Sequence, residues 1–333
     1  MKLAILSPSE NKYSETFIQA HKKYLEGEIF YYSGGKYPNE CNGRNINSLW
    51  NKIFSKFYSR INKDPYFEKK NALRKSLKKN KIDVVLAEYG VCAFHNLESI
   101  KKNKTPLVVH FHGFDASVEV EINKCNKYKE VFEYAVFIIV VSQEMAEMIK
   151  ELGCPKEKVI LNTYGPQPEF EKTTPEFTEK ALIATGRFVD KKAPYYTILA
   201  FARTMDKHPD AHLYLAGDGP LKETCENLVK HLRLEKNVTF LGVITPETFR
   251  SYLGKVYGFV QHSIRAKNGD MEGTPLAVLE SSVSGLPVIS TNHAGIPDVV
   301  INNETGLLSE EHDVETMKNN MIKIFDNRNI AIS

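Results

Sequence analysis

The sequence has few of the features that mark secreted, zinc-stapled or membrane-spanning proteins. Its 333 residues include five cysteines, which are widely scattered and form no C-x-x-C pair. This spacing argues against a disulfide framework and against a cysteine-ligated zinc site. No segment approaches the roughly 18 consecutive apolar residues of a membrane span. The N-terminal apolar run of five residues is too short for a signal peptide. We therefore expect a cytoplasmic protein with free thiols.

Length and charge suggest two domains of different character. A chain of this length exceeds one ordinary core, so two domains of about 150 to 170 residues are expected. The net charge is only +3, but residues 1–170 hold 26 basic and 20 acidic residues, whereas residues 171–333 hold 18 and 21. Much of the excess lies in residues 51–81, where eleven basic residues face two acidic ones. We would therefore expect an anionic partner to bind the first half of the chain.

Short β-branched runs alternate with longer helical patterns, as in parallel sheets with crossover helices. Six strands are predicted in each half. They cover residues 3–6, 28–32, 83–87, 107–111, 136–141 and 158–162, then 181–185, 212–216, 238–242, 258–262, 286–290 and 306–309. Between the halves, residues 164–180 hold three prolines and no helical period. We expect α/β domains at residues 1–165 and 181–333, joined by a linker at residues 166–180.

The loops at the carboxyl ends of the strands are where open α/β proteins bind ligands. The stretch AGDGPLKE, residues 216–223, begins like a dinucleotide fingerprint, but Lys222 stands where G-x-G-x-x-G needs its last glycine. A tight turn would explain Gly217 and Gly219 equally well. The pattern is therefore weak evidence for a nicotinamide cofactor.

Two cations follow the first strand of the second half. In TGRFVDKKAP, Arg187 and Lys192 flank a turn that leads into a helix. Both could point toward a ligand near a helix N-terminus, as a diphosphate-binding pair would. The alternative is ordinary solvated surface, where most charged side chains lie.

Two carboxylates lie eight positions apart in NGDMEGTPLAVLESSVSGLPVIST, residues 268–291. We expect a helix to begin near Thr274 or Pro275, because threonine is a common cap and proline suits the first turn. The free backbone N–H groups of that turn could bind an anion. Glu272 before the helix and Glu280 within it could accept hydrogen bonds from sugar hydroxyls. A nucleotide sugar would suit this combination, and a capped helix with an incidental second glutamate is the alternative.

These motifs resemble a known family. The E-x7-E pair before a Gly-Leu-Pro-Val strand, with GRFVDKK and GDGP upstream, resembles the family 4 retaining glycosyltransferases of GT-B architecture. SETFI (14–18) and HFHGFD (110–115) look most like the colanic-acid and exopolysaccharide branch. The resemblance implies two doubly wound Rossmann-like domains facing a central cleft. The first would bind the acceptor and the second the nucleotide-sugar donor.

The resemblance also implies roles for particular residues. Glu280 would bind the ribose hydroxyls, and Glu272 the sugar hydroxyls near the reacting carbon. Arg187 and Lys192 would hold the diphosphate. The start of the helix and the loop that meets the nucleobase would complete the donor site with Gly273, Thr274, Pro275, Leu276 and Ile244.

His112 of HFHG corresponds to the family histidine that reaches the sugar from the first domain. Judged by itself, His110 or His112 is more simply a hydrogen-bonded histidine at a strand end. The implied reaction transfers a hexosyl unit from a nucleoside diphosphate to an acceptor hydroxyl with retention, and needs no covalent nucleophile. No D-x-D motif is present, so we expect no metal and no cofactor, with cations stabilising the leaving diphosphate.

Two departures from the family pattern keep other functions open. Residues 7–15 lack the glycine-rich loop that many relatives have after the first strand. The chain also stops where relatives continue into a helix that crosses back to the first domain, so we expect that helix to be missing. The alternatives are another GT-B enzyme, such as a sugar phosphorylase or epimerase, and a non-catalytic nucleotide-sugar-binding protein. Nothing suggests nucleic acid as a partner.

The basic segment predicts peripheral contact with an anionic membrane. Eight apolar residues fall on one helical stripe, namely Ile46, Leu49, Trp50, Ile53, Phe54, Phe57, Tyr58 and Ile61. The stripe would ordinarily pack on a sheet. The lysines and arginines that follow would favour an anionic bilayer by about 1 kcal/mol for each one near the surface. Exopolysaccharide relatives extend lipid-linked sugars at the cytoplasmic membrane face, which implies the same location and a saccharide or lipid-linked acceptor.

Overall fold

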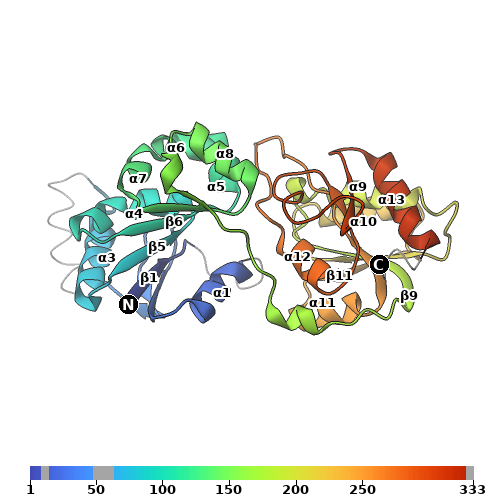
Figure 1. The fold of residues 1–333 in the computed structure, drawn as a ribbon, viewed down its shortest axis with the longest axis horizontal. Helices are drawn as coiled ribbons and strands as arrows, with labels where there is room; N and C mark the ends of the chain where they lie inside the picture. Colours follow the sequence, from blue (N-terminus) through green and yellow to red (C-terminus); the bar gives the residue numbers. More distant parts are fainter. Residues whose placement is uncertain (9–14, 48–63, 328–333) are drawn as a thin grey trace. The chain divides into compact units, whose positions relative to one another are not determined.

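The chain forms two compact units, residues 1–162 and 163–333, shown in Figure 1 from blue to green and from green to red. The computed structural model describes residues 1–8, 15–47 and 64–327. Each unit holds its own mainly parallel sheet. The fold is that of two Rossmann-like α/β units, as the strand pattern predicts.

The first unit is built on a sheet in the order β4-β3-β2-β1-β5-β6-β7-β8. Its pairs are parallel except for β2–β3 and β3–β4, which are antiparallel. Strand order reverses between β1 and β5, which is the position where such sheets bind ligands. The strands are β1 (Lys2–Leu6), β2 (Glu28–Ser33), β3 (Glu40–Cys41), β4 (Arg44–Asn45), β5 (Val84–Glu88), β6 (Leu107–His110), β7 (Phe137–Val140) and β8 (Val159–Leu161).

Helices connect these strands (Figure 1), and each of them buries some of its side chains. In α8, Ser142 caps the N-terminus by accepting a hydrogen bond from the Met145 N–H, and Met145, Ala146 and Ile149 form the buried face. The helices are α1 (Thr16–Tyr24), α3 (Phe67–Asn80), α4 (Gly90–Lys102), α5 (Phe114–Ser117), α6 (Glu119–Lys124), α7 (Lys129–Tyr134) and α8 (Gln143–Glu151), with 3-10 turns at Asn126–Tyr128 and Lys156–Lys158.

The second unit is built on a parallel sheet in the order β11-β10-β9-β12-β13-β14. Its strand order reverses between β9 and β12, so the loops that follow these two strands lie at the ligand-binding position. The strands are β9 (Glu179–Thr185), β10 (His212–Ala216), β11 (Val238–Gly242), β12 (Val256–Val260), β13 (Val288–Thr291) and β14 (Gly306–Ser309).

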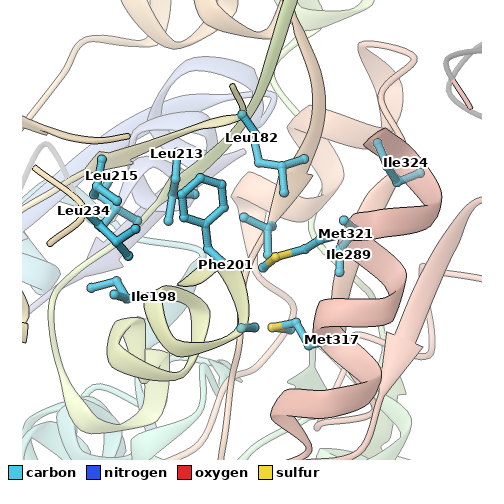
Figure 2. Packing of buried hydrophobic residues seen from close by; sticks show 14 of the residues in the cluster. Leu182, Ile198, Phe201, Leu213, Leu215, Leu234, Ile289, Met317, Met321 and Ile324 are labelled. Carbon is cyan, nitrogen blue, oxygen red and sulfur yellow. The ribbon is translucent and has the colours of Figure 1, made fainter. Parts of the chain in front are cut away.

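The second sheet buries both faces, because successive residues of a strand point to opposite sides. Leu182 of β9 packs in a core with helices α9 (Pro194–Ala202), α10 (Lys222–His231) and α13 (Val314–Asp326), where Figure 2 shows Phe201 and Met317. The neighbouring Ile183 packs in the opposite core with α11 (Pro246–Leu253) and α12 (Leu276–Val283). Burial on both faces explains why these strands read as nearly continuous apolar runs.

The twelve predicted strands are all present, with ends within two residues of those expected. The two-residue strands β3 and β4 were not predicted, because such short segments carry no alternating pattern. The segment expected as a linker, residues 166–180, packs on the second unit. It contains the 3-10 helix η3 (Pro168–Lys172), whose Phe170 is buried in the core beside α11 and α12.

The helix predicted over residues 46–61 falls largely on residues 48–63, which lie outside the described residues. Within the part of the chain that is described, no helix is both long and apolar enough to cross a membrane.

Candidate functional site

The candidate site of the second unit begins with two loops that touch backbone to backbone. After β9, the Gly186 N–H donates to the Ala216 carbonyl, and the Phe188 N–H donates to the Asp218 carbonyl. Gly217 has a φ of +130°, and a Cβ there would lie 1.9 Å from the Gly186 carbonyl oxygen. The glycine is therefore required by this close approach and by its backbone conformation. The turn interpretation of GDGP explains the motif without a nicotinamide cofactor.

These loops leave a small pocket of about 30 Å³ at the carboxyl end of β9. Gly186, Arg187 and Lys192 line it, together with Gln261 from the end of β12. The pocket thus lies at the strand-order reversal, and it includes both predicted cations. Arg187 is exposed and, within the described residues, forms no ion pair.

Lys192 is the cation that the structure ties to a predicted carboxylate. It ends the 3-10 helix η4 (Asp190–Lys192). Its Nζ lies 3.2 Å from Gln261 Oε1 and 3.1 Å from Glu272 Oε2. The side chain of Lys192 is 16% exposed and that of Glu272 is 8% exposed. Burial lowers the pKa of Lys192, and the charge of Glu272 opposes that shift.

Lys191 has a structural role that the sequence did not reveal. Its Nζ donates to Asp270 Oδ1 at 2.9 Å and to the Met271 carbonyl at 3.1 Å. Its own carbonyl accepts from the Ile264 N–H. Lys191 thereby fastens the loop that carries Glu272. Lys191 and Lys192 therefore have different roles, and a pattern of residue types could not distinguish these roles.

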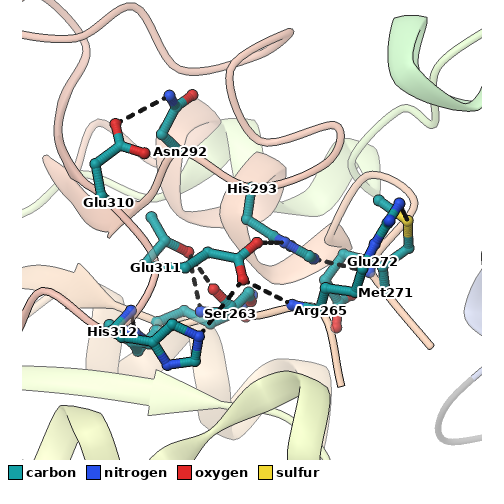
Figure 3. Close-up of polar contacts among 12 residues, drawn as sticks. Ser263, Arg265, Met271, Glu272, Asn292, His293, Glu310, Glu311 and His312 are labelled. Atoms are coloured by element: carbon teal, nitrogen blue, oxygen red, sulfur yellow. Dashed lines mark hydrogen bonds and ion pairs between the residues drawn. The ribbon is translucent and has the colours of Figure 1, made fainter. Parts of the chain in front are cut away.

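Glu272 is held at its backbone by a chain of hydrogen bonds through the buried His293 and the partly exposed Glu311 (Figure 3). Its N–H donates to His293 Nε2 at 3.2 Å, and His293 Nδ1 lies 2.6 Å from Glu311 Oε1. Because Nε2 accepts, the proton of neutral His293 sits on Nδ1 and is donated to Glu311. Glu311 also accepts from the Arg265 N–H at 2.9 Å. His293 and Glu311 were absent from the predicted site, since they lie on another segment of the chain.

The side chain of Glu272 is buried, ionised and only partly satisfied. Burial by itself raises its pKa, but the charges of Lys192 and Lys191 outweigh that effect, so the pKa lies below its ordinary value. Glu272 Oε1 is buried and makes no hydrogen bond to any described residue. A buried carboxylate oxygen without a donor is an acceptor position for a ligand hydroxyl.

The helix after Glu272 starts one or two residues later than predicted. It spans Leu276–Val283 with Pro275 at the cap position, and no side chain caps it. The predicted threonine cap is therefore wrong, and Thr274 lies before the helix. In the described structure the backbone N–H groups of Leu276 and Ala277 have no acceptor, as expected for a first turn open to an anion. The Gly273 carbonyl accepts from the Gly295 N–H, which anchors the loop.

Two predicted donor-binding residues stand apart from the contacts of Lys192 and Glu272. Glu280 lies in the second turn of α12 and is buried, which raises the pKa of its carboxyl to about 7. Ile244 follows β11 and is half-buried against the core beside α11 and α12. Within the described residues, no hydrogen bond or ion pair joins either of them to Lys192 or Glu272. Their ribose and nucleobase roles stay predictions.

In the first unit, His112 belongs to a buried cluster that was not predicted. Its Nε2 lies 2.9 Å from Glu88 Oε2, and its side chain is 3% exposed. Glu88, fully buried at the end of β5, also has His21 Nδ1 at 2.7 Å and His110 Nδ1 at 3.6 Å. Phe17 stacks on His112 with ring centroids 4.3 Å apart. His112 Nε2 is directed at Glu88. The expected contact of His112 with a sugar is not tested by this geometry and stays a prediction.

The electrostatics of this cluster favour neutral His110 and His112 beside an ionised Glu88. Burial lowers the pKa of His112 to about 3. Burial also raises the pKa of Glu88, but the nearby His110 and the hydrogen bonds to His112 and His21 hold it well below the ordinary value. The acidic residue that ends the apolar run DVVLAE is a sequence signal that could have pointed to Glu88.

Comparison with known families covers both units. Residues 32–162 match the model described as "Glycosyltransferase Family 4", and residues 167–331 match "Glycosyl transferases group 1". The chain belongs to the family 4 glycosyltransferases. The branch suggested by the motifs is supported by two relatives named as polysaccharide-biosynthesis glycosyltransferases. They are the putative colanic acid glycosyltransferase WcaL of Escherichia coli (27% identity, covering 57% of this chain and 48% of WcaL) and the amylovoran glycosyltransferase AmsK of Erwinia amylovora (28%, 57% and 47%).

This family 4 chain spans about half the length of these curated relatives. Among solved structures it is similar to HepE of Anabaena in complex with UDP, with a TM-score of 0.75 at 16% identity, covering 99% of this chain and 93% of HepE. It is also similar to sucrose-phosphate synthase of Thermosynechococcus elongatus, with a TM-score of 0.74 at 18% identity, covering 99% and 91%. At such identities the likeness establishes the GT-B fold.

Proposed function

We propose that this protein is a retaining glycosyltransferase that moves a hexosyl unit from a nucleoside-diphosphate sugar to a saccharide acceptor in surface polysaccharide synthesis. The observation that carries the proposal is Glu272, whose Oε2 pairs with Lys192 while its buried Oε1 has no donor among the described residues. A carboxylate in that state can accept a sugar hydroxyl beside a cation that can hold phosphate.

The site suits departure of a diphosphate. As the glycosidic bond breaks, negative charge grows on the leaving group and must be stabilised by positioned donors. Lys192 and Arg187 supply cations at the pocket, and the first turn of α12 supplies N–H groups at Leu276 and Ala277. These groups could act in place of a metal ion, so we propose metal-free donor chemistry. Retention would follow from attack on the face that the diphosphate leaves, with no covalent intermediate.

Donor binding and transfer test the proposal together. The purified chain is screened by thermal shift against UDP-, GDP-, ADP- and TDP-sugars, since a ligand at 100 times its dissociation constant stabilises by about 2.7 kcal/mol. The stabilising donor is then assayed for transfer and for hydrolysis. We expect nucleoside diphosphate release without orthophosphate. Release that requires orthophosphate would identify a phosphorylase, and binding without turnover would identify a non-catalytic nucleotide-sugar-binding protein.

Two glutamate variants test the division of roles within the donor site. If Glu280 binds the ribose, Glu280→Gln weakens the free nucleotide and the intact donor alike. Glu272→Gln retains affinity for the free nucleotide and lowers kcat, because it removes a contact to the sugar and not to the nucleotide. Calorimetry with UDP and GDP measures the first effect, and steady-state kinetics the second. An equal loss of nucleotide affinity in both variants would contradict the assignment.

We further propose that the acceptor is lipid-linked and that the protein contacts the cytoplasmic membrane face through α3. The apolar side of α3 packs inward at Ala72, Leu73 and Leu77. Four lysines of the helix and one directly after it are exposed, namely Lys69, Lys75, Lys78, Lys79 and Lys81. Exposed lysines of this kind attract anionic lipid headgroups.

Lys70 does not belong to the exposed set, because it is paired with Asp64 and Glu98. A test by charge reversal should therefore change the exposed Lys69, Lys78, Lys79 and Lys81 to Glu and leave Lys70 intact. We expect salt-sensitive co-sedimentation with vesicles containing phosphatidylserine, abolished by the four Glu substitutions and absent with neutral vesicles. Binding that is indifferent to salt and to charge reversal would contradict membrane contact through α3.

A further inference from the structure

Three chain segments bring nitrogen and oxygen ligands together inside the first unit. His21 comes from α1, Glu88 from the end of β5 and His110 from the end of β6. One potential ligand atom from each lies within 4.8 Å of the other two. The group sits beside the β1–β5 reversal of strand order, and none of its three residues is used in the proposed donor site. Sixty-seven residues separate His21 from Glu88, so only the tertiary fold assembles the set.

Glu88 is a buried carboxylate that is surrounded by imidazole side chains. Glu88 has no exposed side-chain surface, and its ion-pair partners among the described residues are all histidines. Buried carboxylates usually pair with a cationic side chain or coordinate a metal. A metal ion held between Glu88 and two of these imidazoles would complete such a coordination set.

The distances are close to those of a metal site. Ligands bound to zinc at about 2.0 to 2.2 Å in tetrahedral geometry stand roughly 3.3 Å from one another. His110 Nδ1 lies 3.6 Å from Glu88 Oε2, beyond an ordinary hydrogen bond. His21 Nδ1 lies 2.7 Å from Glu88 Oε1, so this contact would open by about 0.6 Å on binding.

The surroundings supply an orienting group and a route from solvent. His112 Nε2 lies 2.9 Å from Glu88 Oε2 and can hold the carboxylate in place, as outer hydrogen-bond partners do in metal sites. The side chain of His21 is 22% exposed, which opens the cluster on the α1 side. Two imidazoles and one carboxylate favour a first-row transition metal over magnesium or calcium, which prefer oxygen ligands throughout.

We propose that His21, Glu88 and His110 bind one divalent transition-metal ion, with Zn²⁺ the best match and His112 orienting the carboxylate. From the sequence we expected no metal, and the geometry of this cluster revises that expectation for the first unit. It does not depend on the proposed glycosyltransferase function, because binding is measured without donor or acceptor.

Metal titration of the full chain tests the site. The protein is stripped with a chelator, which is then removed, and is titrated with Zn²⁺ by calorimetry and with Co²⁺ by visible absorption. We expect one equivalent to bind with a dissociation constant in the micromolar range or below. The Co²⁺ spectrum should show the intense bands of a low-coordinate nitrogen- and oxygen-ligated site.

Matched variants separate this site from adventitious binding. Glu88→Gln keeps the shape of the side chain and removes its charge, and His21→Gln changes a partly exposed ligand that the fold can lose. Each should weaken binding by more than about 100-fold, whereas His112→Asn should weaken it by about 10- to 100-fold, as loss of an outer partner does. His95→Gln, on α4, is the control and should bind like the wild type.

Circular dichroism and melting in chelator establish that each variant is folded before its affinity is compared. The proposal is overturned if the folded wild type binds no metal, or if Glu88→Gln and His21→Gln bind as tightly as His95→Gln. Either result would leave the cluster as a hydrogen-bond network that positions His112.

Discussion

Replacing Lys192 with methionine should destabilise the second unit by leaving Glu272 buried without its cation. The pair is largely enclosed, with side chains 16% and 8% exposed and 3.1 Å between Nζ and Oε2. Removing one partner of a buried ion pair typically costs about 3 to 5 kcal/mol. Lys191 still contributes positive charge near Glu272, so we expect about 3 kcal/mol. For a unit of this size that lowers the melting temperature by about 6 to 12 °C.

The loss should depend on pH in a defined direction. In the wild type the pKa of Glu272 is depressed, so its stabilisation is present above the unfolded pKa of about 4.3 and is lost as pH falls through the folded pKa. In Lys192→Met, burial would raise the folded pKa above the unfolded one. Ionised Glu272 then destabilises the variant, and protonation relieves the penalty as pH falls. The difference between the two proteins should therefore shrink from pH 8 toward pH 5.

Calorimetric melting across this pH range measures the effect, and hydrogen-exchange mass spectrometry of peptides from residues 163–327 assigns the transition to the second unit. The control is Lys180→Met, which removes a more exposed pair with Asp210 and should cost at most about 1 kcal/mol. The double variant Lys192→Met/Glu272→Gln has no buried unpaired carboxylate and should recover most of the loss. The reasoning fails if Lys192→Met is no more harmful than Lys180→Met, or if the double variant recovers nothing.

Three further predictions concern single residues of the second unit. Burial raises the pKa of Glu280 to about 7, so the wild type loses stability as pH rises from the unfolded pKa of about 4.3 through 7. In thermal melting, Glu280→Gln should be more stable than the wild type at pH 8 and no more stable near pH 4. A stability gain of the variant that grows as pH falls would contradict this prediction. His293→Phe removes the acceptor of the Glu272 N–H and should lower kcat while calorimetry shows nucleotide affinity nearly unchanged, whereas a pure loss of nucleotide binding would argue against this positioning role. Arg187→Ala should weaken UDP or GDP by about 1.5 kcal/mol, the lower end for a charge-assisted contact because the side chain is exposed, and unchanged calorimetric affinity would remove Arg187 from the diphosphate site.

The positions of the strands along the chain could be predicted from the sequence, because the pattern that marks a strand is a local property. Each core strand of the parallel sheets is buried on both faces, so its residues form a short apolar run such as ALIAT in β9. The tight turn at Gly217 could also be predicted from the glycines of GDGP. In the structure, only glycine fits both the φ of this position and the nearby carbonyl oxygen. The start of α12 was less accurate, because Thr274 and Pro275 are common both at helix caps and directly before them.

The motif residues were found from sequence order, but their working contacts were not. R-x4-K and E-x7-E identified Arg187, Lys192, Glu272 and Glu280 as candidates. Residue type alone could not tell that Lys192 pairs with Glu272 while the adjacent Lys191 fastens the loop beside it. That difference depends on which direction each side chain leaves the short helix η4, and a change of one position rotates the side chain to another face.

The sequence by itself determined the two-domain α/β architecture, the family motifs and the order of the candidate site residues. These features depend on residues that are close together in the chain, namely the alternation of apolar strands and helices, the residues of the turns and the spacing within each motif. Only the tertiary structure decided that His293 and Glu311 support Glu272, and that His21, Glu88 and His110 meet in one buried cluster. These groups come from separate strands and helices. They lie close together because the strand order of each sheet brings distant segments side by side. They contact one another because buried polar groups need hydrogen-bond partners, which these segments provide.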